Sequence, residues 1–190
     1  DAHDGLVLLR GAFSLDQQVR LARAALVDWV DPPNLSNLSA EHDAAALTRL
    51  FERATVAADD AAAALLPLRR WVTLGYQYDW TARVYNENAF VPMPRDLHSL
   101  VKSLVHCACG TDAPPYASEA VIVNYYHADS TLCGHLDDAE RFFDAPIVSI
   151  SLGLDAVFLL GGRTKDVAPT PILLRSGDVV LMGGESRHAF

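Results

Sequence analysis

The second half of the chain carries five short apolar segments, each four to seven residues long and each bounded by residues that favour turns. Gly161-Gly162 and Ser176-Gly177 are two of these turn signals. Several short strands at this spacing are typical of a jelly roll or barrel, in which two sheets face each other. The five predicted strands are residues 120–126, 146–152, 156–160, 171–174 and 178–182.

Helical periodicity dominates the beginning of the chain. Ser14 and Gln17 have the spacing of a capping box, in which each side chain bonds the other residue's backbone N–H. Apolar residues then recur at helical intervals as far as Val30, and Pro32-Pro33 ends the pattern. Residues 44–66 are rich in alanine, which favours a second helix.

The middle of the chain alternates between strand and helix signals. Residues 7–9 form a short apolar run, and residues 70–78 are rich in β-branched and aromatic side chains, so both are predicted strands. Residues 80–94 contain aromatic residues and proline and are predicted to form a loop. A third helix begins at Asp96 with one apolar stripe and ends before Gly110, a natural C-terminal cap residue.

These elements together predict an α+β fold. We expect a double-stranded β-helix, or jelly roll, with the N-terminal helices packed on its outside. The helical part is too small for a separate domain, so residues 1–190 are predicted to form one domain. In this division, residues 1–115 are the helical half and residues 116–190 are the jelly-roll core, with the C-terminal part of the core missing.

The charge of the chain argues against a general attraction to nucleic acid. Its net charge is −9, and an acidic protein does not attract phosphates through its overall field. Local basic groups occur at Arg69-Arg70 and at Arg163 with Lys165, and we interpret them as ordinary solvated loop and strand-end charges rather than as a binding patch.

Membrane spans and disulfides are also not indicated. No apolar run approaches the roughly 20 residues that cross a bilayer. The three cysteines, Cys107, Cys109 and Cys133, have no C-x-x-C spacing. An odd number of cysteines without such spacing fits a reducing, intracellular compartment. The sequence does not distinguish mitochondrion, nucleus and cytoplasm, and we expect a monomer without membrane contact.

His135 and Asp137 are two residues apart, and in a strand such residues point to the same side. An imidazole and a carboxylate that converge, with one more imidazole, make the facial triad of non-haem iron(II) oxygenases. His-x-Asp alone is a weak signal, because the wet end of a strand carries the same residues for solubility.

Asn124 and Tyr126 form a similar pair at the end of an otherwise apolar strand face. An amide and a phenol need hydrogen-bond partners if they are buried. Backbone groups or water at the strand end would satisfy them, and so would a polar small molecule beside a metal. The spacing supports both interpretations equally.

Several longer motifs occur together with these pairs and give the chain a family resemblance. The chain resembles the AlkB family of iron(II)- and 2-oxoglutarate-dependent dioxygenases, and in particular its AlkB homolog 1 branch. The resemblance extends from about Gly5 to the last residue and is dense from Trp71 onward. The motifs that carry it are R-W-V-T-L-G-Y-Q-Y-D-W (70–80), N-Y-Y-H-A-D-S-T-L-C-G-H-L-D (124–137), A-P-I-V-S-I-S-L-G (145–153), F-L-L-G-G (158–162) and S-G-D-V-V-L-M-G-G-E-S-R (176–187).

The resemblance implies a role for several residues. His135 and Asp137 match the first two iron ligands, which are also the catalytic residues. Asn124 and Tyr126 match residues that hydrogen-bond 2-oxoglutarate. Trp71 and Tyr76 fall in a segment that forms part of the nucleotide-recognition lid, although both also suit a core. Asp178 matches a turn residue that shapes the barrel.

The third iron ligand departs from the family pattern. In the family this histidine lies four residues after the arginine that corresponds to Arg187, which here is position 191, one past Phe190. The family arginine that pairs with the far carboxylate of 2-oxoglutarate also lies further on. We interpret the chain as an excerpt of a longer protein; the alternative is a truncated product. His188 is a candidate ligand only if the expected residue after Phe190 is absent.

The implied activity is oxidative demethylation of N-methylated bases in DNA or RNA, tRNA included, with release of formaldehyde and succinate. Iron(II) and 2-oxoglutarate are the implied cofactors. A methylated base would have to be flipped or single-stranded to reach such a site. The alternative is a catalytically incomplete AlkB-like module that binds nucleic acid or protein. The sequence does not specify the nucleic acid or the modified base.

Overall fold

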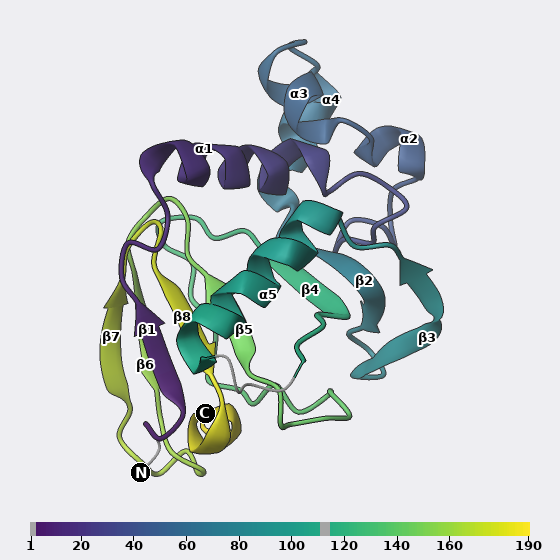
Figure 1. Ribbon diagram of the computed structural model, residues 1–190. Helices are drawn as coiled ribbons and strands as arrows, with labels where there is room; N and C mark the ends of the chain where they lie inside the picture. Colours follow the sequence, from purple (N-terminus) through teal and green to yellow (C-terminus); the bar gives the residue numbers. More distant parts are fainter. Residues whose placement is uncertain (1–2, 111–114) are drawn as a thin grey trace. The chain divides into compact units, whose positions relative to one another are not determined.

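The computed structural model describes residues 3–110 and 115–190 (Figure 1). These residues form two compact units. Unit 1 contains the described residues within Asp1–Val19, Asp96–Ala117 and Thr131–Phe190. Unit 2 contains Arg20–Arg95 and Ser118–Ser130. Each unit therefore combines segments that are distant in the sequence. The single dioxygenase domain over residues 1–190, divided after residue 115, stays a prediction.

Unit 1 is built on a three-stranded antiparallel sheet with the order β1-β8-β5. Its strands are β1 (Leu6–Leu9), β8 (Val179–Met182) and β5 (Ile147–Ile150). Two further strands, β6 (Ala156–Leu160) and β7 (Thr170–Leu174), pair antiparallel with each other. The strands predicted near residues 7–9, 146–152, 156–160, 171–174 and 178–182 are thus confirmed.

The central strand β8 forms the most deeply buried part of unit 1. Val179, Val180 and Leu181 are at most 1% exposed, which explains why this strand reads as a continuous apolar run. Helix α5 (Arg95–Cys109) contributes the predicted apolar stripe, and Leu97, Val101, Leu104 and Val105 are all buried. The short 3-10 helix η3 (Gly184–His188) follows β8 directly.

Asp178 joins the start of the chain to the turn before β8. Its carboxylate accepts hydrogen bonds from the Gly11 N–H at 2.8 Å and the Arg175 N–H at 3.0 Å. The Arg10 guanidinium lies 2.6 Å from the same carboxylate. The Asp178 residue is 3% exposed. A buried carboxylate with this many donors is a structural group, in agreement with the turn role that the resemblance implies.

The backbone at Gly5, just before β1, lies too close to Gly183 for a side chain, and a substitution there tests this close approach. Its φ is +80°, and a Cβ atom there would lie 2.2 Å from the Gly183 carbonyl oxygen. Gly153 has a similar φ of +91°, and an added Cβ would meet no described atom within 4 Å. We expect Gly5→Ala to lower the free energy of unfolding by roughly 2–4 kcal/mol and Gly153→Ala by about 1 kcal/mol. Chemical denaturation of both variants checks this, and equal losses would contradict the close backbone approach at Gly5.

Unit 2 contains a second three-stranded antiparallel sheet with the order β3-β2-β4. β2 (Trp71–Asp79) is the predicted strand of residues 70–78, and β4 (Ala120–Asn124) is the strand predicted to reach residue 126. β3 (Val84–Val91) replaces the predicted loop of residues 80–94, so that prediction was wrong. Its residues pair with the far half of β2, and the register shifts between Tyr76 and Gln77. β3 is mostly exposed and carries polar residues, so it lacks the regular apolar pattern by which strands are predicted.

The predicted single helix of residues 44–66 was also wrong. It is divided into α2 (Ala44–Leu47), α3 (Leu50–Thr55), α4 (Asp60–Leu65) and the 3-10 helix η2 (Leu66–Leu68). Arg49 has a left-handed backbone (φ 50°), and its N–H donates to both Asp31 carboxylate oxygens, at 2.9 and 3.0 Å. Asp59 caps α4 by accepting from the Ala61 and Ala62 N–H groups. These polar contacts break the helix despite the alanine content.

Helix α1 (Leu15–Arg23) begins with the predicted capping box. The Ser14 N–H donates to Gln17 Oε1 at 2.8 Å, and the Gln17 N–H donates to Ser14 Oγ at 3.3 Å. The helix continues as a π-helical turn, η1 (Ala24–Asp28). The helix predicted to reach residue 30 is thus confirmed as far as residue 28, with a π-helical last part. Across the described part of the chain, no helix combines the length and apolar character that a bilayer crossing requires.

Candidate metal site

His135 and Asp137 lie close together in unit 1. His135 Nε2 is 3.6 Å from Asp137 Oδ1, and the side chains are 53% and 44% exposed. Residues 131–146 have no strand or helix, so the strand predicted to bring the two groups together was wrong. The groups converge through the local course of this segment, which we call the ligand segment (131–146). It leads into β5.

The protonation of His135 suits a metal ligand. His135 Nδ1 lies 2.9 Å from the Cys133 carbonyl oxygen. Because a carbonyl oxygen can only accept, Nδ1 carries a proton in this contact, and Nε2, on the side of Asp137, is the nitrogen that could bind a metal in the neutral ring. A ligand histidine whose second nitrogen donates to a backbone carbonyl is the usual arrangement at metal centres. An imidazole nitrogen and a carboxylate fit iron(II), so the residues present fit the metal as two of its donors.

Several charges surround Asp137. Partial burial raises the pKa of the Asp137 carboxyl, and the positive charge of His135, when protonated, lowers it. Glu140 raises this pKa further, Arg187 lowers it, and Asp138 raises it. The net result is a pKa of the Asp137 carboxyl above its usual value, with burial as the largest cause.

No third donor completes the pair within residues 3–110 and 115–190. His188 lines the same small pocket as Asp137, but its ring stacks on Phe143 with a centroid separation of 5.5 Å and an angle of 25°. Among the described residues, His188 therefore does not form a metal-binding cluster with His135 and Asp137, and its conditional assignment as a ligand stays a prediction. The pocket measures about 220 Å³ and is lined by Leu136, Asp137, Asp138, Phe143, Arg163, Arg187 and His188.

Arg187 is the residue of this region that the sequence analysis missed. Its side chain is only 1% exposed. The guanidinium donates to the Asp137 carbonyl oxygen, lies 2.7 Å from Glu140 Oε2, and stands over the Phe143 ring at 4.8 Å from the centroid. The resemblance used Arg187 only to count to the next ligand. No sequence pattern reveals this role, because its partners Asp137 and Glu140 lie 50 and 47 residues earlier in the chain.

Asn124 and Tyr126, the predicted 2-oxoglutarate residues, belong to unit 2. Asn124 ends β4 opposite Trp71 of β2 and is exposed. Tyr126 follows the strand and is 55% exposed. Of the two residues predicted to lie on one strand, only Asn124 does so. Their role as co-substrate ligands stays a prediction.

Trp71 and Tyr76 take part in a run of aromatic contacts along β2 and β3 of unit 2. Trp71 packs against Trp80 at 5.1 Å, and Tyr76 packs against Phe90 at 4.9 Å. Trp80 is 47% and Phe90 52% exposed. These rings are therefore partly accessible and are not a closed core, which agrees with a surface that stacks on bases. Tyr78 and Tyr85 extend the run, with contacts of 4.8 Å to Trp80 and 5.1 Å to each other.

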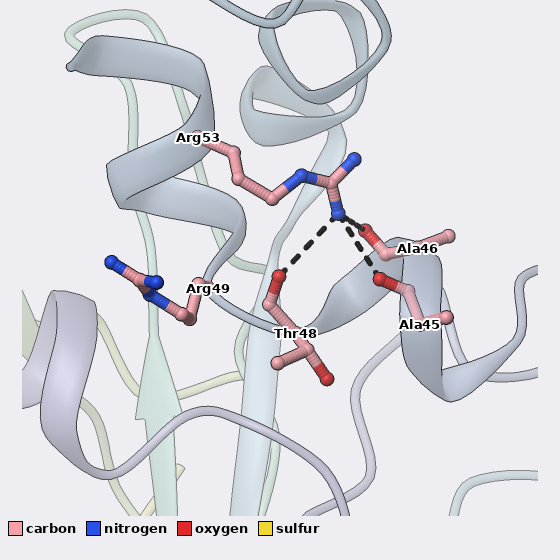
Figure 2. A pocket seen from close by; sticks show the side chains of 5 residues that line it. All are labelled: Ala45, Ala46, Thr48, Arg49 and Arg53. Carbon is pink, nitrogen blue, oxygen red and sulfur yellow. Dashed lines mark hydrogen bonds between the residues drawn. The ribbon is translucent and has the colours of Figure 1, made fainter. Parts of the chain in front are cut away.

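Another hollow lies in unit 2, and contacts that stabilise the fold account for it. Arg53 reaches back to the end of α2 and donates to the carbonyl oxygens of Ala45, Ala46 and Thr48, at 3.1, 3.0 and 3.4 Å (Figure 2). It also pairs with Asp59 at 2.7 Å. Helix ends leave carbonyl groups without partners, and Arg53 supplies donors to them. The Arg53 side chain is thus fully used in holding α2 and α3 together.

Comparison with known proteins places the chain in a family. The sequence model described as "2OG-Fe(II) oxygenase superfamily" matches residues 17–190. The chain is 36% identical to the Arabidopsis thaliana "DNA N(6)-methyladenine demethylase ALKBH1A", covering 100% of this chain and 63% of that protein. It is 34% identical to the Schizosaccharomyces pombe "tRNA demethylase abh1", covering 98% and 66%. It is 35% identical to the human "Nucleic acid dioxygenase ALKBH1", covering 97% and 48%.

A solved structure supports the fold. The structure of OsALKBH1 aligns with a TM-score of 0.68 at 24% identity, over 98% of this chain and 82% of that one. The predicted α+β jelly-roll fold is thereby confirmed. The chain spans about half to two thirds of the length of the curated relatives described above. The chain belongs to the 2OG-Fe(II) oxygenase superfamily, whose cofactors are iron(II) and 2-oxoglutarate, and within it resembles the AlkB homolog 1 proteins.

Proposed function

We propose that the protein is an iron(II)- and 2-oxoglutarate-dependent dioxygenase that demethylates N-methylated bases in DNA or RNA, tRNA included. The observation that carries the proposal is the His135–Asp137 pair. Its imidazole donates from Nδ1 to a backbone carbonyl and presents Nε2 3.6 Å from the carboxylate. The names of the relatives, which include a DNA demethylase and a tRNA demethylase, support the substrate class.

Each predicted residue has a task in this proposal. His135 Nε2 and the Asp137 carboxylate hold iron(II), and Asn124 and Tyr126 orient 2-oxoglutarate through their amide and phenol groups. When bound, iron(II) and 2-oxoglutarate supply the oxidation of a substrate methyl group by molecular oxygen, with succinate, carbon dioxide and formaldehyde as products.

The aromatic residues of β2 and β3 serve the substrate. Trp71 and Tyr76 contribute to a partly exposed surface of rings on which an unstacked base can lie. Stacking of this kind is tolerant of sequence and contributes about 1–3 kcal/mol per base. The net charge of −9 offers no general attraction to phosphate, so base stacking and local contacts provide the affinity.

The domain, assembly and compartment belong to the same proposal. We infer that residues 1–190 belong to a single dioxygenase domain, with residues 1–115 as its helical half and 116–190 as its jelly-roll core, and that the protein acts as a monomer without membrane contact. Cys107, Cys109 and Cys133 are free and exposed, which favours a reducing intracellular compartment, whether mitochondrion, nucleus or cytoplasm.

A turnover assay tests the proposal. The full-length protein is incubated with iron(II), 2-oxoglutarate and a panel of DNA and tRNA oligonucleotides with single N-methylated bases. We expect one or a few substrates to give succinate and formaldehyde in about equal amounts, because each demethylation consumes one 2-oxoglutarate. Binding of the oligonucleotides without either product would favour the catalytically incomplete binding module instead.

A further inference from the structure

The ligand segment (131–146) has no regular secondary structure, yet it carries both candidate iron ligands. Residues in a strand or helix are positioned by the backbone hydrogen bonds of that element. A segment without such bonds needs other contacts to hold a ligand within a fraction of an ångström of its required place. The Asp137 backbone therefore needs a contact from another part of unit 1 to hold it in place.

Arg187 makes three contacts with the ligand segment. One guanidinium reaches the Asp137 carbonyl oxygen, the Glu140 carboxylate at 2.7 Å and the Phe143 ring at 4.8 Å. These three groups span seven residues of the ligand segment. Arg187 itself lies in η3, directly after the buried strand β8, and its side chain is 1% exposed. The contacts therefore link the ligand segment to η3, which follows the deeply buried strand β8.

The chemistry of the guanidinium suits a tether better than a binding group. Its planar fork offers several donors in a fixed geometry, which fixes direction as well as distance. Arg187 Nε is buried and has no hydrogen-bond partner among the described residues. A buried donor without a partner costs free energy, which the contacts of the other guanidinium donors must offset. The side chain is 1% exposed, and the contacts described above are all made to the ligand segment.

We propose that Arg187 is a positioning residue that fixes the Asp137 ligand by bonding its carbonyl oxygen and by holding Glu140 and Phe143 on the same segment. The proposal rests on the proposed function in that it treats Asp137 as an iron ligand. It goes beyond that function because it assigns the geometry of the ligand segment to one side chain fifty residues further along the chain.

The test uses the metal-free full-length protein and has two readouts. Hydrogen exchange of residues 131–146 reports the tether directly, and calorimetric titration with Mn(II) in the presence of 2-oxoglutarate reports the ligand geometry. We expect Arg187→Met to speed exchange in this segment roughly tenfold. We expect it to weaken Mn(II) binding about 10–100-fold, the usual effect of losing a residue that orients a metal ligand. Arg187→Lys and Glu140→Gln should give smaller changes in the same direction, because each keeps part of the contact set.

Arg53→Met is the matched control. Arg53, in unit 2, also bonds main-chain carbonyls (Figure 2). It also pairs with a carboxylate, that of Asp59. Its loss should speed exchange around residues 43–49 and leave both the ligand segment and Mn(II) affinity unchanged. This variant therefore separates the loss of any buried arginine from the loss of this tether.

Each result decides the proposal. Exchange that rises only in residues 131–146, together with weaker Mn(II) binding, supports it. Wild-type affinity in Arg187→Met, or exchange that rises throughout unit 1, overturns it. If Arg187→Met does not fold, unchanged affinity in both Arg187→Lys and Glu140→Gln overturns it equally. A wild-type protein that binds no Mn(II) would refute the proposed function, and the exchange measurement would still decide whether Arg187 holds the segment.

Discussion

Replacing either His135 or Asp137 by alanine should reduce succinate formation by the full-length protein at least about a thousandfold. Residues that merely orient a metal ligand are worth about 10–100-fold, so loss of a ligand itself should exceed this range. The reduction should come from lost iron binding, because each variant removes one donor of the pair and leaves the other exposed to water. Quantification of succinate and formaldehyde under saturating 2-oxoglutarate measures the effect.

The fold should survive both substitutions. The two side chains are 53% and 44% exposed, and exposed side chains outside special contacts usually change stability by at most about 0.5 kcal/mol. Asp144→Asn is the matched control, because Asp144 is an exposed acid on the same segment and belongs to neither the pair nor its pocket. Activity that persists in His135→Ala at unchanged melting temperature would remove His135 from the site.

The second large effect is expected at Asp178, on stability rather than activity. Asp178→Ala should lower the free energy of unfolding by about 3 kcal/mol, because it leaves the Gly11 and Arg175 N–H groups without their buried acceptor. The contribution of Arg10 is smaller, since the Arg10 side chain is 47% exposed and screened by water. For a chain of this size, the melting temperature should fall by roughly 6–12 °C.

Asp155→Ala is the matched control for this variant. Asp155 also lies in unit 1 and pairs with an arginine, Arg175, but at 4.0 Å and with a side chain that is 59% exposed. Such surface pairs contribute about 0–1 kcal/mol. Similar losses in the two variants, measured by thermal unfolding, would contradict the assignment of Asp178 as the buried anchor.

Asp178 should also make the protein sensitive to acid. Hydrogen bonds from the Arg175 and Gly11 backbone, and then the Arg10 guanidinium, lower the pKa of Asp178 from 3.8 to about 2. A carboxyl whose pKa is lower in the folded state stabilises the fold above its unfolded pKa, and this contribution of roughly 2 kcal/mol is lost as the pH falls from about 4 to 2. The stability gap between wild type and Asp178→Asn should therefore narrow over this range. A gap that stays constant would refute the lowered pKa.

Periodicity predicted those parts of the fold whose burial is local. The apolar run of β8 and the stripe of α5 were recognisable because each buries one continuous set of side chains. The helix of residues 44–66 could not be predicted correctly, because the Asp31–Arg49 contact that breaks it joins residues 18 positions apart. β3 was missed for a similar reason, since its polar side chains reveal nothing of its pairing with β2.

The sequence named candidate residues for the site, and their roles stay predictions, but it did not reveal what positions them. Strand periodicity suggested that His135 and Asp137 converge, whereas a bond from the His135 ring to the Cys133 carbonyl and the contacts of Arg187 produce that geometry. Contacts between a side chain and a distant backbone carbonyl leave no pattern in the sequence. A family resemblance indicates which residues bind, and only the structure indicates what holds them in place.

The iron content of the reconstituted protein reports whether His135 and Asp137 hold the metal. The full-length wild type, the double variant His135→Ala/Asp137→Ala and the Asp144→Asn control would be loaded anaerobically with iron(II) and 2-oxoglutarate, desalted, and analysed for iron per chain. We predict about one iron in the wild type and the control, and almost none in the double variant. Equal iron content in all three proteins would contradict the assignment of His135 and Asp137 as the ligands.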